Sequence, residues 1–389
     1  MNEFHPPRRI LLGPGPSDAD NRVLLALSAP LVGHLDPEFL KVMDDIQALL
    51  RYVFETQNKL TIPISGTGSA GMEAAFVNLV EPGDSVVVCV NGVFGERMSD
   101  IVGRCGGALT RVEAAWGASF DFDQIREALT KTHPGILAVV HAETSTGVLT
   151  SLPKIRKVLD EFPETLLLLD CVTSLGGHPV EIDRYQVDFA YSGTQKCLSC
   201  PPGLAPITLS EKAVSVLRRR KSKVPSWYLD LTMVEKYWGD ERTYHHTAPI
   251  SMNYALREAL RIVHEEGLEN RWARHHLNHR ALVAGVEAMG LTMLCKPDDR
   301  LWSLNTIRIP EGVSDAGVRT QLLQDFGIEI GGGLGPLKNK IWRVGLMGSS
   351  SHRNNVLLFL NALEQVLSQQ SMSLERGAAV SAAMNVYYN

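Results

Sequence analysis

The sequence lacks the long apolar runs of a membrane protein. No window approaches the roughly 18 consecutive apolar residues that a bilayer-spanning helix requires, and the N-terminus has no apolar leader. It also lacks a disulfide framework, because its six cysteines are scattered along 389 residues (Cys89, Cys105, Cys171, Cys197, Cys200 and Cys295). These absences favour a cytoplasmic protein with free, mostly buried thiols.

A strong excess of one charge is also missing. The formal net charge is −5, and the densest basic run, Arg218–Lys223, is short and typical of a solvated helix end. We therefore expect no nucleic-acid partner. With 44% apolar and 21% charged residues the composition is that of an ordinary globular protein, and 389 residues exceed what a single core usually holds, so we expect two domains.

Two short motifs resemble metal or redox sites but lack what those sites need. Cys197 and Cys200 form a C-x-x-C, yet no second cysteine pair follows. His245 and His246 are adjacent, so their side chains diverge in most backbones, and no nearby acid completes a ligand set. We therefore predict no metal site.

Short apolar runs alternate with helical periods along the first two thirds of the chain. Residues 37–54 have the apolar spacing of a helix, and residues 60–64, 85–90, 136–140, 166–169 and 187–191 read as strands. This alternation predicts an α/β fold with a mainly parallel, helix-covered sheet. We expect an N-terminal arm (residues 1–20), a large domain (21–268) and a smaller C-terminal α/β domain (269–389).

Polar or aromatic residues follow several of the predicted strands. Ser69, Phe94, Thr144, Asp170 and Lys196 each come after an apolar run. Because ligands of parallel sheets bind at the carboxyl ends of the strands, we expect these side chains to share one site.

Each neighbouring motif has a structural and a functional interpretation. The loop of residues 65–69 (SGTGS) is either an ordinary helix cap or an anion site at a helix N-terminus. Phe94 either packs in the core or stacks on a flat ligand. The Gly13–Pro16 turn is either a domain entry or a backbone wall of the site.

Arg343 lies within an apolar run, where an unpaired guanidinium would be costly. It requires an anionic partner, which is either a structural carboxylate or the carboxylate of a substrate. The histidines of the segment that follows residue 251 are expected on a solvated helix face (His264, His275, His276 and His279).

Asp170 ends one predicted strand and Lys196 follows the next. Pyridoxal phosphate enzymes need such a pair, a lysine that holds the aldehyde as a Schiff base and a carboxylate that keeps the pyridine nitrogen protonated. This pair predicts a pyridoxal phosphate enzyme.

Ten motifs in order strengthen that hypothesis and span nearly the whole chain: LLGPGPS, SGTGSAGMEAA, VNGVFGER, HAETSTGVL, LLLDCVTSLGG, YSGTQKCLSCPPG, YHHT, ALREAL, GGGLGP and WRVGLMG. On these motifs the chain resembles the class V aminotransferases of fold type I. It is most similar to the branch that contains alanine–glyoxylate and serine–pyruvate aminotransferases.

The resemblance implies a role for each matching residue. Lys196 would form the internal aldimine and move the proton, and Asp170 would pair with the pyridinium nitrogen. Val172 and Phe94 would lie on the two faces of the ring, and Thr144 near its phenolic oxygen. The phosphate would be held by Thr67, Gly68, Ser69 and Gln195, together with Tyr244 and Thr247 from the other subunit of a homodimer.

The resemblance also implies a substrate site and a reaction. Arg343 would bind the α-carboxylate, and the backbone near Gly15 would close the site. The implied reaction is ping-pong transfer of the amino group of alanine or serine to glyoxylate, which gives glycine and a 2-oxo acid.

Two related reactions remain open. Ureidoglycine–glyoxylate aminotransferases share the TQKCLS, KIWR and ALRE wording, but the two positions where that branch carries amide side chains hold His34 and Tyr244 here. His34 either meets a polar substrate tail or caps a turn. A cysteine desulfurase would need a mobile catalytic cysteine, which the position of Cys295 disfavours. A non-enzymatic role would require a lost lysine or aspartate, and both residues are present.

Overall fold

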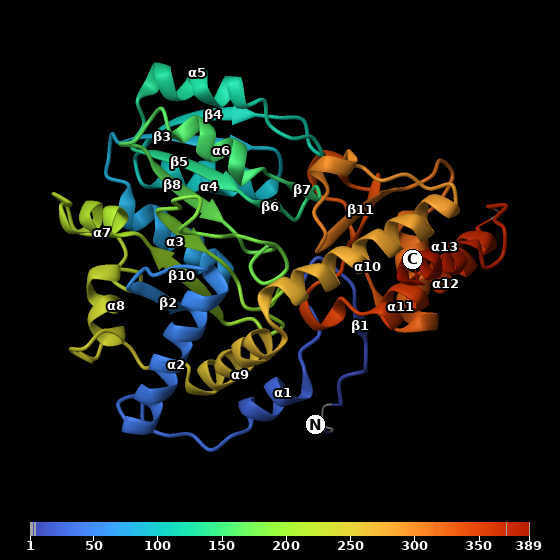
Figure 1. Cartoon of the computed structure of the whole chain (residues 1–389), viewed down its shortest axis with the longest axis horizontal. Helices are drawn as coiled ribbons and strands as arrows, with labels where there is room; N and C mark the ends of the chain where they lie inside the picture. Colours follow the sequence, from blue (N-terminus) through green and yellow to red (C-terminus); the bar gives the residue numbers. More distant parts are fainter. Residues whose placement is uncertain (1–2, 4, 371, 389) are drawn as a thin grey trace.

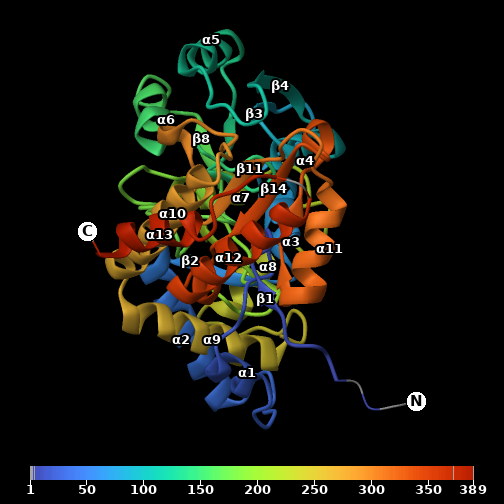
Figure 2. The same ribbon diagram turned by 90° about the vertical axis from the view of Figure 1, so that its right-hand side faces the viewer.

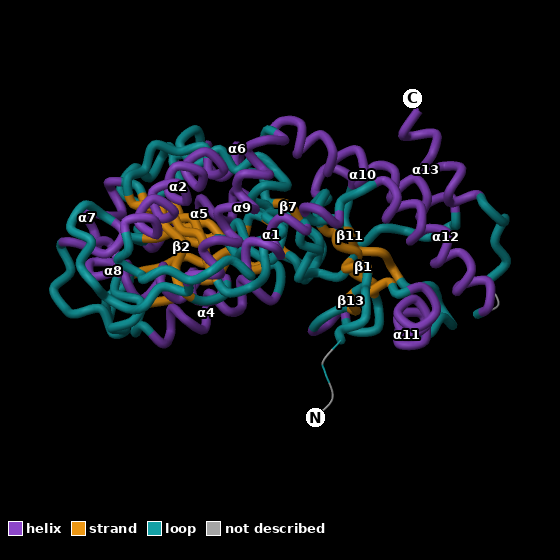
Figure 3. The backbone as a smooth tube through the Cα atoms, turned by 90° about the horizontal axis from the view of Figure 1, so that it is seen from below, coloured by secondary structure: helices purple, strands orange, loops and turns teal. Residues whose placement is uncertain are grey.

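The computed structural model describes residues 3, 5–370 and 372–388 and has two lobes (Figures 1 and 3). The large lobe is built around one cluster of buried side chains that runs from Val23 to Leu268. The small lobe is built around a second cluster, which joins Leu12 to residues between Ala281 and Ala383. The separation of the clusters agrees with the expected domains, whose boundaries stay a prediction.

A seven-stranded sheet forms the centre of the large lobe, with strand order β2-β10-β9-β8-β5-β3-β4. Its strands are β2 (Leu60–Ser65), β3 (Ser85–Val90), β4 (Ala108–Glu113), β5 (Ile136–Val140), β8 (Leu166–Asp170), β9 (Phe189–Tyr191) and β10 (Leu204–Leu209). Only β10 runs antiparallel to its neighbours, so the predicted mainly parallel sheet is confirmed.

Helices cover this sheet, as the alternating pattern predicts. They are α1 (Asn21–Leu27), α2 (Pro37–Phe54), α3 (Gly68–Leu79), α4 (Val93–Arg104), α5 (Phe122–Thr132), α6 (Leu152–Leu159), α7 (Glu211–Arg218), α8 (Leu231–Trp238) and α9 (Ile250–Glu266). Helix α2 has the bounds predicted from the sequence, because Asp36 caps its first turn and Pro37 begins it. A two-stranded sheet, β6 (Ala142–Glu143) with β7 (Val148–Leu149), follows β5.

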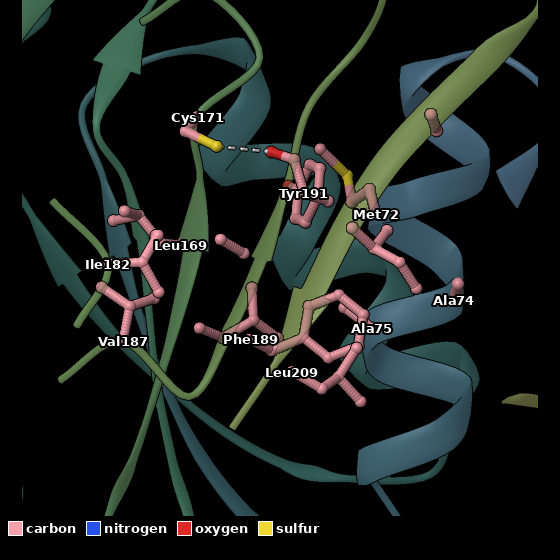
Figure 4. Close-up of a cluster of buried hydrophobic side chains, with 14 of the residues drawn as sticks. Met72, Ala74, Ala75, Leu169, Cys171, Ile182, Val187, Phe189, Tyr191 and Leu209 are labelled. Carbon is pink, nitrogen blue, oxygen red and sulfur yellow. Dashed lines mark hydrogen bonds between the residues drawn. The ribbon is translucent and has the colours of Figure 1, made fainter. Parts of the chain in front are cut away.

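The carboxyl ends of the central strands are level with one another. Asp170 at the end of β8 lies opposite Val140 of β5 on one side and Tyr191 of β9 on the other. Figure 4 shows the core beneath this edge, where Tyr191 lies beside Met72 of α3, Leu169 lies beside Ile182, and Cys171 Sγ donates to the Tyr191 carbonyl (3.1 Å). This packing fixes the position of the polar groups at the strand ends.

The small lobe combines short strands with long helices (Figure 2). Its elements are β11 (Leu304–Arg308), β12 (Ile328–Glu329), β13 (Gly331–Gly332), β14 (Ile341–Gly345), α10 (Leu268–Ala288), α11 (Asp315–Phe326), α12 (Arg353–Gln369), α13 (Ala378–Tyr388) and the 3-10 turns Pro297–Asp299, Gly335–Leu337 and Gly348–Ser350. The N-terminal segment joins this lobe, since β1 (Ile10–Leu11) pairs in parallel with β12. Residues 378–388 form helix α13.

The predicted solvated histidine face is wrong for two of its four members. His264 and His276 are exposed, but His275 and His279 are buried in the middle of α10. Helix α10 keeps one exposed face, to which His276 belongs, whereas His275 and His279 lie on its buried side. His275 Nε2 accepts the Gly348 N–H (2.9 Å), and His279 Nδ1 bonds the Asn305 side chain (2.6 Å). Tertiary partners thus satisfy polar groups that the sequence pattern assigns to solvent.

Across the described residues, every helix is too short or too polar to span a bilayer.

Candidate active site

Lys196 lies in the loop between β9 and β10 and is held by the N-terminal segment. Ser17 Oγ donates to the Lys196 carbonyl (2.7 Å), and the Ser17 N–H donates to the Gln195 carbonyl (2.9 Å). The Lys196 ammonium donates to the carbonyl of Pro14. Only 9% of the residue is exposed, and this burial, with a smaller contribution from the charge of Arg343, lowers the pKa of Lys196 to about 8. A substantial fraction of this amine is therefore neutral near pH 8.

Gly15 is a backbone wall beside this amine. Its φ of +109° is a conformation that residues with a side chain rarely adopt, and a Cβ at this position would lie 2.5 Å from Lys196 Nζ. The Gly13–Pro16 turn is thus part of the site rather than only a domain entry.

Asp170 is the buried carboxylate of the site. Its oxygens accept the Val172 N–H (2.9 Å) and the Tyr191 hydroxyl (2.9 Å). Burial raises the pKa of Asp170 to about 6, although both hydrogen bonds and the charge of Lys196 oppose the rise. Asp170 is therefore mainly ionised at pH 7, and its direction is fixed by two donors.

The loop before α3 has the properties of an anion site. Thr67 is the N-cap residue, but its side chain makes no capping hydrogen bond, and both Thr67 and Ser69 are exposed. Gly68 packs closely against Gly193, with 3.5 Å between its ideal Cβ position and Gly193 Cα. Gln195 Oε1 is buried and has no hydrogen-bond partner in the described part of the chain. The free N–H groups at this helix N-terminus suit a phosphate group, and the Gln195 side chain can donate to it through its amide NH2 group.

Phe94 and Thr144 lie on the neighbouring strand ends. Phe94 is in the first turn of α4, partly buried against the core, and the Arg97 guanidinium lies 5.0 Å from its ring centroid. Thr144 follows β6, is almost fully buried, and shares a hydrogen bond with the hydroxyl of Thr173. Phe94 therefore packs partly against the core and also lies at the edge of the sheet that carries the site.

Arg343 of β14 has no carboxylate partner within ion-pair distance among the described residues. Its Nε donates to the Gly332 carbonyl (2.7 Å) and its Nη1 to the Thr144 carbonyl (3.3 Å). Burial lowers the pKa of Arg343 to about 10, so the group is still charged at pH 7. The structural ion-pair interpretation is wrong for the described chain, and a buried cation held only by carbonyls remains able to bind a carboxylate.

Tyr244, Thr247 and His34 form a separate group. The Tyr244 hydroxyl lies 3.4 Å from Thr247 Oγ1, and the rings of His34 and Tyr244 are 5.0 Å apart. Tyr244 is 54% exposed, and within the described chain neither Tyr244 nor Thr247 hydrogen-bonds residues 67–69. The structure does not bring this group onto the phosphate loop of its own chain.

Large surface cavities do not mark this site. One of about 790 Å³ lies beside Asp44, Arg51 and Trp238, and another of about 740 Å³ lies beside Tyr52 and Trp272. Neither is lined by Lys196 or Asp170, and we locate the site by its chemistry because only the sheet edge combines a buried amine with a buried carboxylate.

Sequence reasoning missed three groups that shape the site. Tyr191 and the carbonyl of Pro14 are partners of Asp170 and Lys196. Glu143 is a fully buried carboxylate next to Thr144. Glu143 follows the strand 136–140 much as Asp170 ends the strand 166–170, and this shared pattern is the signal that would have found it.

The lowered pKa of Lys196 predicts how its reactivity depends on pH. Reductive methylation of the amine requires its neutral form, so the rate at Lys196 should rise about tenfold per pH unit up to about pH 8 and then level off. Peptide mass spectrometry after brief treatment with formaldehyde and cyanoborohydride measures this rate. A rate at Lys196 that still climbs steeply at pH 10 would show that burial does not lower its pKa.

Comparisons with known proteins agree with this geometry. A family model described as aminotransferase class V matches residues 25–344. The chain is 40% identical, over 405 aligned positions, to the (S)-ureidoglycine–glyoxylate transaminase of Bacillus subtilis, covering 100% of this chain and 97% of that protein. It is also 40% identical, over 365 positions, to the alanine–glyoxylate aminotransferase of Rattus norvegicus, covering 93% and 88%.

Solved structures give the same result. An alanine–glyoxylate aminotransferase from Nostoc sp. superposes with a TM-score of 0.93 at 50% identity, covering 94% of this chain and 97% of that one. The ureidoglycine–glyoxylate aminotransferase of Bacillus subtilis superposes with a TM-score of 0.97 at 41% identity over the full length of both chains. The chain belongs to the class V aminotransferases and has their fold type I architecture.

Proposed function

We propose that this aminotransferase moves the amino group of a small amino acid, alanine or serine, to glyoxylate with pyridoxal phosphate as cofactor. The observation that carries the proposal is a buried amine (Lys196) and a buried carboxylate (Asp170) at one sheet edge, with the unpaired Arg343 guanidinium close enough to lower the lysine pKa. Relatives named for alanine and glyoxylate support the choice of substrates.

The residues present fit pyridoxal phosphate. Thr67, Gly68, Ser69 and the unpartnered Gln195 amide suit its phosphate. Asp170 suits the ring nitrogen, Val172 and Phe94 the ring faces, and Thr144 the phenolic oxygen. When bound, this cofactor supplies an electrophilic carbonyl carbon and an electron-withdrawing ring.

The protein's own groups supply binding and proton transfer. Lys196 in its neutral form accepts the proton from the substrate Cα, and its hydrogen bond to Pro14 aims the amine across Gly15. Asp170 is mainly ionised at pH 7 and is oriented by Val172 and Tyr191, so it would keep the ring nitrogen of the bound cofactor protonated.

Substrate selection falls to Arg343. The guanidinium already donates to two carbonyls, which fix its plane and leave its other N–H groups available to a ligand. Arginine suits this task because its planar donors match both oxygens of a carboxylate. Amino donors and amino-group acceptors that carry an α-carboxylate are therefore the favoured substrates.

(S)-Ureidoglycine is the second candidate donor, because an aminotransferase named for this substrate matches this chain over the chain's full length. His34 and Tyr244, the two positions that depart from that branch, lie side by side. A desulfurase is disfavoured. The Cys295 thiol is buried and donates to the Thr146 carbonyl (3.2 Å), and burial raises its pKa to about 11.

A donor panel tests the proposal. Alanine, serine and (S)-ureidoglycine are each supplied with glyoxylate or pyruvate, and product formation is followed by mass spectrometry. We expect kcat/KM with alanine or serine and glyoxylate to exceed that with ureidoglycine by at least about tenfold, because no amide side chain stands at 34 or 244. A preference for ureidoglycine would replace the proposed donor, and no transfer from any donor would refute the function.

A homodimer with shared active sites is part of the proposal. Exposed apolar side chains support it: Leu25 (70% exposed), Leu31 (69%) and Trp227 (60%), whose ring stacks on His245 next to Tyr244. In a dimer, Tyr244 and Thr247 would reach the partner's phosphate loop. Sedimentation of a 42.8 kDa monomer would contradict this. The cytoplasmic location expected from the composition stays a prediction.

A further inference from the structure

Glu143 is a buried carboxylate to which the proposed reaction gives no role. It ends β6, is 0% exposed, and has no basic side chain within ion-pair distance among the described residues. Its oxygens instead accept three hydrogen bonds, from the Phe94 N–H (3.2 Å), the Ser145 N–H (3.1 Å) and the Ser145 hydroxyl (2.5 Å). A carboxylate held only by neutral donors in the interior requires an explanation.

The first consequence of these bonds is a cap on α4. The N-cap residue of that helix is Gly92, which has no side chain to accept the free N–H groups. The Val93 N–H donates to Ser145 Oγ (3.0 Å), and the Phe94 N–H donates to Glu143. A Cβ on Gly92 would lie 2.3 Å from the Glu143 side chain, so the glycine admits the carboxylate. The start of α4 is thus fixed by a neighbouring loop.

The second consequence reaches the small lobe. Thr144 lies between the two capping residues, and its carbonyl accepts a hydrogen bond from Arg343 Nη1 (3.3 Å). Phe94 belongs to the large lobe and Arg343 to the small one. The three residues 143–145 therefore link the aromatic wall of the site to its carboxylate-binding cation.

We propose that Glu143 is a positioning residue, which holds Phe94 and Arg343 at a fixed separation. Phe94 can then contact the cofactor ring while Arg343 binds the carboxylate of the same substrate. This inference rests on the proposed roles of Phe94 and Arg343. The hydrogen bonds of Glu143 go to the Phe94 amide and to Ser145, so we assign it no direct contact with cofactor or substrate. It acts through the Phe94 amide on one side and through the Thr144 carbonyl on the other.

Loss of Glu143 has two opposing effects on carboxylate binding. Burial raises the pKa of Glu143 to about 7, so KM is measured near pH 8.5, where the group is ionised. Its negative charge then favours the charged form of Arg343 and partly offsets its field. Removing that charge alone would strengthen the attraction for a substrate carboxylate and lower KM. If Phe94 and Arg343 lost their fixed separation, KM would instead rise. The sign of the change in KM therefore decides between a positioning residue and a simple counter-charge.

The test compares Glu143→Gln with Asp188→Asn. Asp188 is a matched control, because it is also a buried carboxylate that accepts a main-chain N–H (Leu167, 2.9 Å) and a serine hydroxyl (Ser210, 2.7 Å). It lies at the opposite ends of β8 and β9 from the site. A general effect of losing a buried carboxylate would appear in both variants.

Three measurements are made on each variant. In Glu143→Gln we expect about tenfold faster hydrogen exchange at the amides of residues 93–96 in the cofactor-free protein, since glutamine cannot accept all three bonds. We also expect about tenfold weaker binding of pyridoxal phosphate and about tenfold higher KM for alanine, with kcat changed less than about threefold. Asp188→Asn should change none of these quantities more than about twofold.

Several results would overturn the proposal. Faster exchange with unchanged KM and cofactor binding would make Glu143 a helix cap only, and a lower KM would make it a counter-charge. Equal changes in Asp188→Asn would make the effect general. If Glu143→Gln does not fold, Ser145→Ala keeps the carboxylate and decides by the same criteria. Hydrogen exchange and cofactor binding do not depend on turnover, so they remain informative even if the proposed transamination is refuted.

Discussion

Lys196→Ala is expected to lower the rate of amino-group transfer by roughly 10³- to 10⁴-fold, because no other amine is placed to accept the Cα proton. The side chain lies in a narrow space beside Gly15 and Pro14, and among the described contacts no second lysine approaches it. Single-turnover kinetics with alanine, in protein saturated with pyridoxal phosphate, measure the proton-transfer step directly.

Lys212→Ala is the matched control for this variant. The Lys212 ammonium also donates to main-chain carbonyls, those of Pro163 (2.6 Å) and Thr165 (3.1 Å), but far from the sheet edge that carries Asp170. Its removal should leave kcat within about twofold of the parent value. Parental turnover in Lys196→Ala would refute the assigned role of the lysine.

Asp170→Asn is expected to lower kcat by roughly 10²- to 10³-fold, the usual cost of losing one oriented charge that stabilises a transition state. Asparagine is nearly isosteric and can still accept the Val172 N–H, and the Tyr191 hydroxyl can rotate to accept from the new amide. The geometry should survive while the charge is lost. Comparison of kcat with that of Asp188→Asn, which removes a buried carboxylate outside the site, isolates this effect.

The same variant should be more stable than the parent at pH 7. The folded pKa of Asp170, about 6, lies above its ordinary value, so folding disfavours the ionised form, and the resulting cost is present above pH 6 and disappears below about pH 4. The stability gained at pH 7 is on the order of 3 kcal/mol at most. Urea unfolding at pH 7 and pH 4 measures it. A gain of the same size at both pH values would contradict the role of the charge.

The sequence predicts those parts of the molecule that local rules determine. The apolar spacing of residues 37–54 predicts helix α2 with its observed bounds, and the apolar strands that precede Asp170 and Lys196 single out these two residues. Groups whose importance depends on distant contacts escaped prediction. The Pro14 carbonyl accepts a hydrogen bond from Lys196, which lies 182 positions later in the chain, and no local sequence pattern predicts such a contact.

The prediction of a solvated face for the histidines of α10 was wrong for a related reason. Helix α10 has one exposed face, which holds His276, and one buried face, which holds His275 and His279. His275 and His279 are buried there because loop amides and the Asn305 side chain satisfy their ring nitrogens. Which side of a helix is buried depends on the assembled fold, and the local sequence does not predict it.

The pairing of β1 with β12 sets the order in which the enzyme can mature during translation. Ile10, among the first residues made, pairs with Ile328, which leaves the ribosome hundreds of residues later. The large lobe can acquire its core early, since domains fold as they emerge. The β1–β12 pair, which ties the segment carrying Pro14 and Ser17 to the small lobe, can form only after residue 328 has been synthesised.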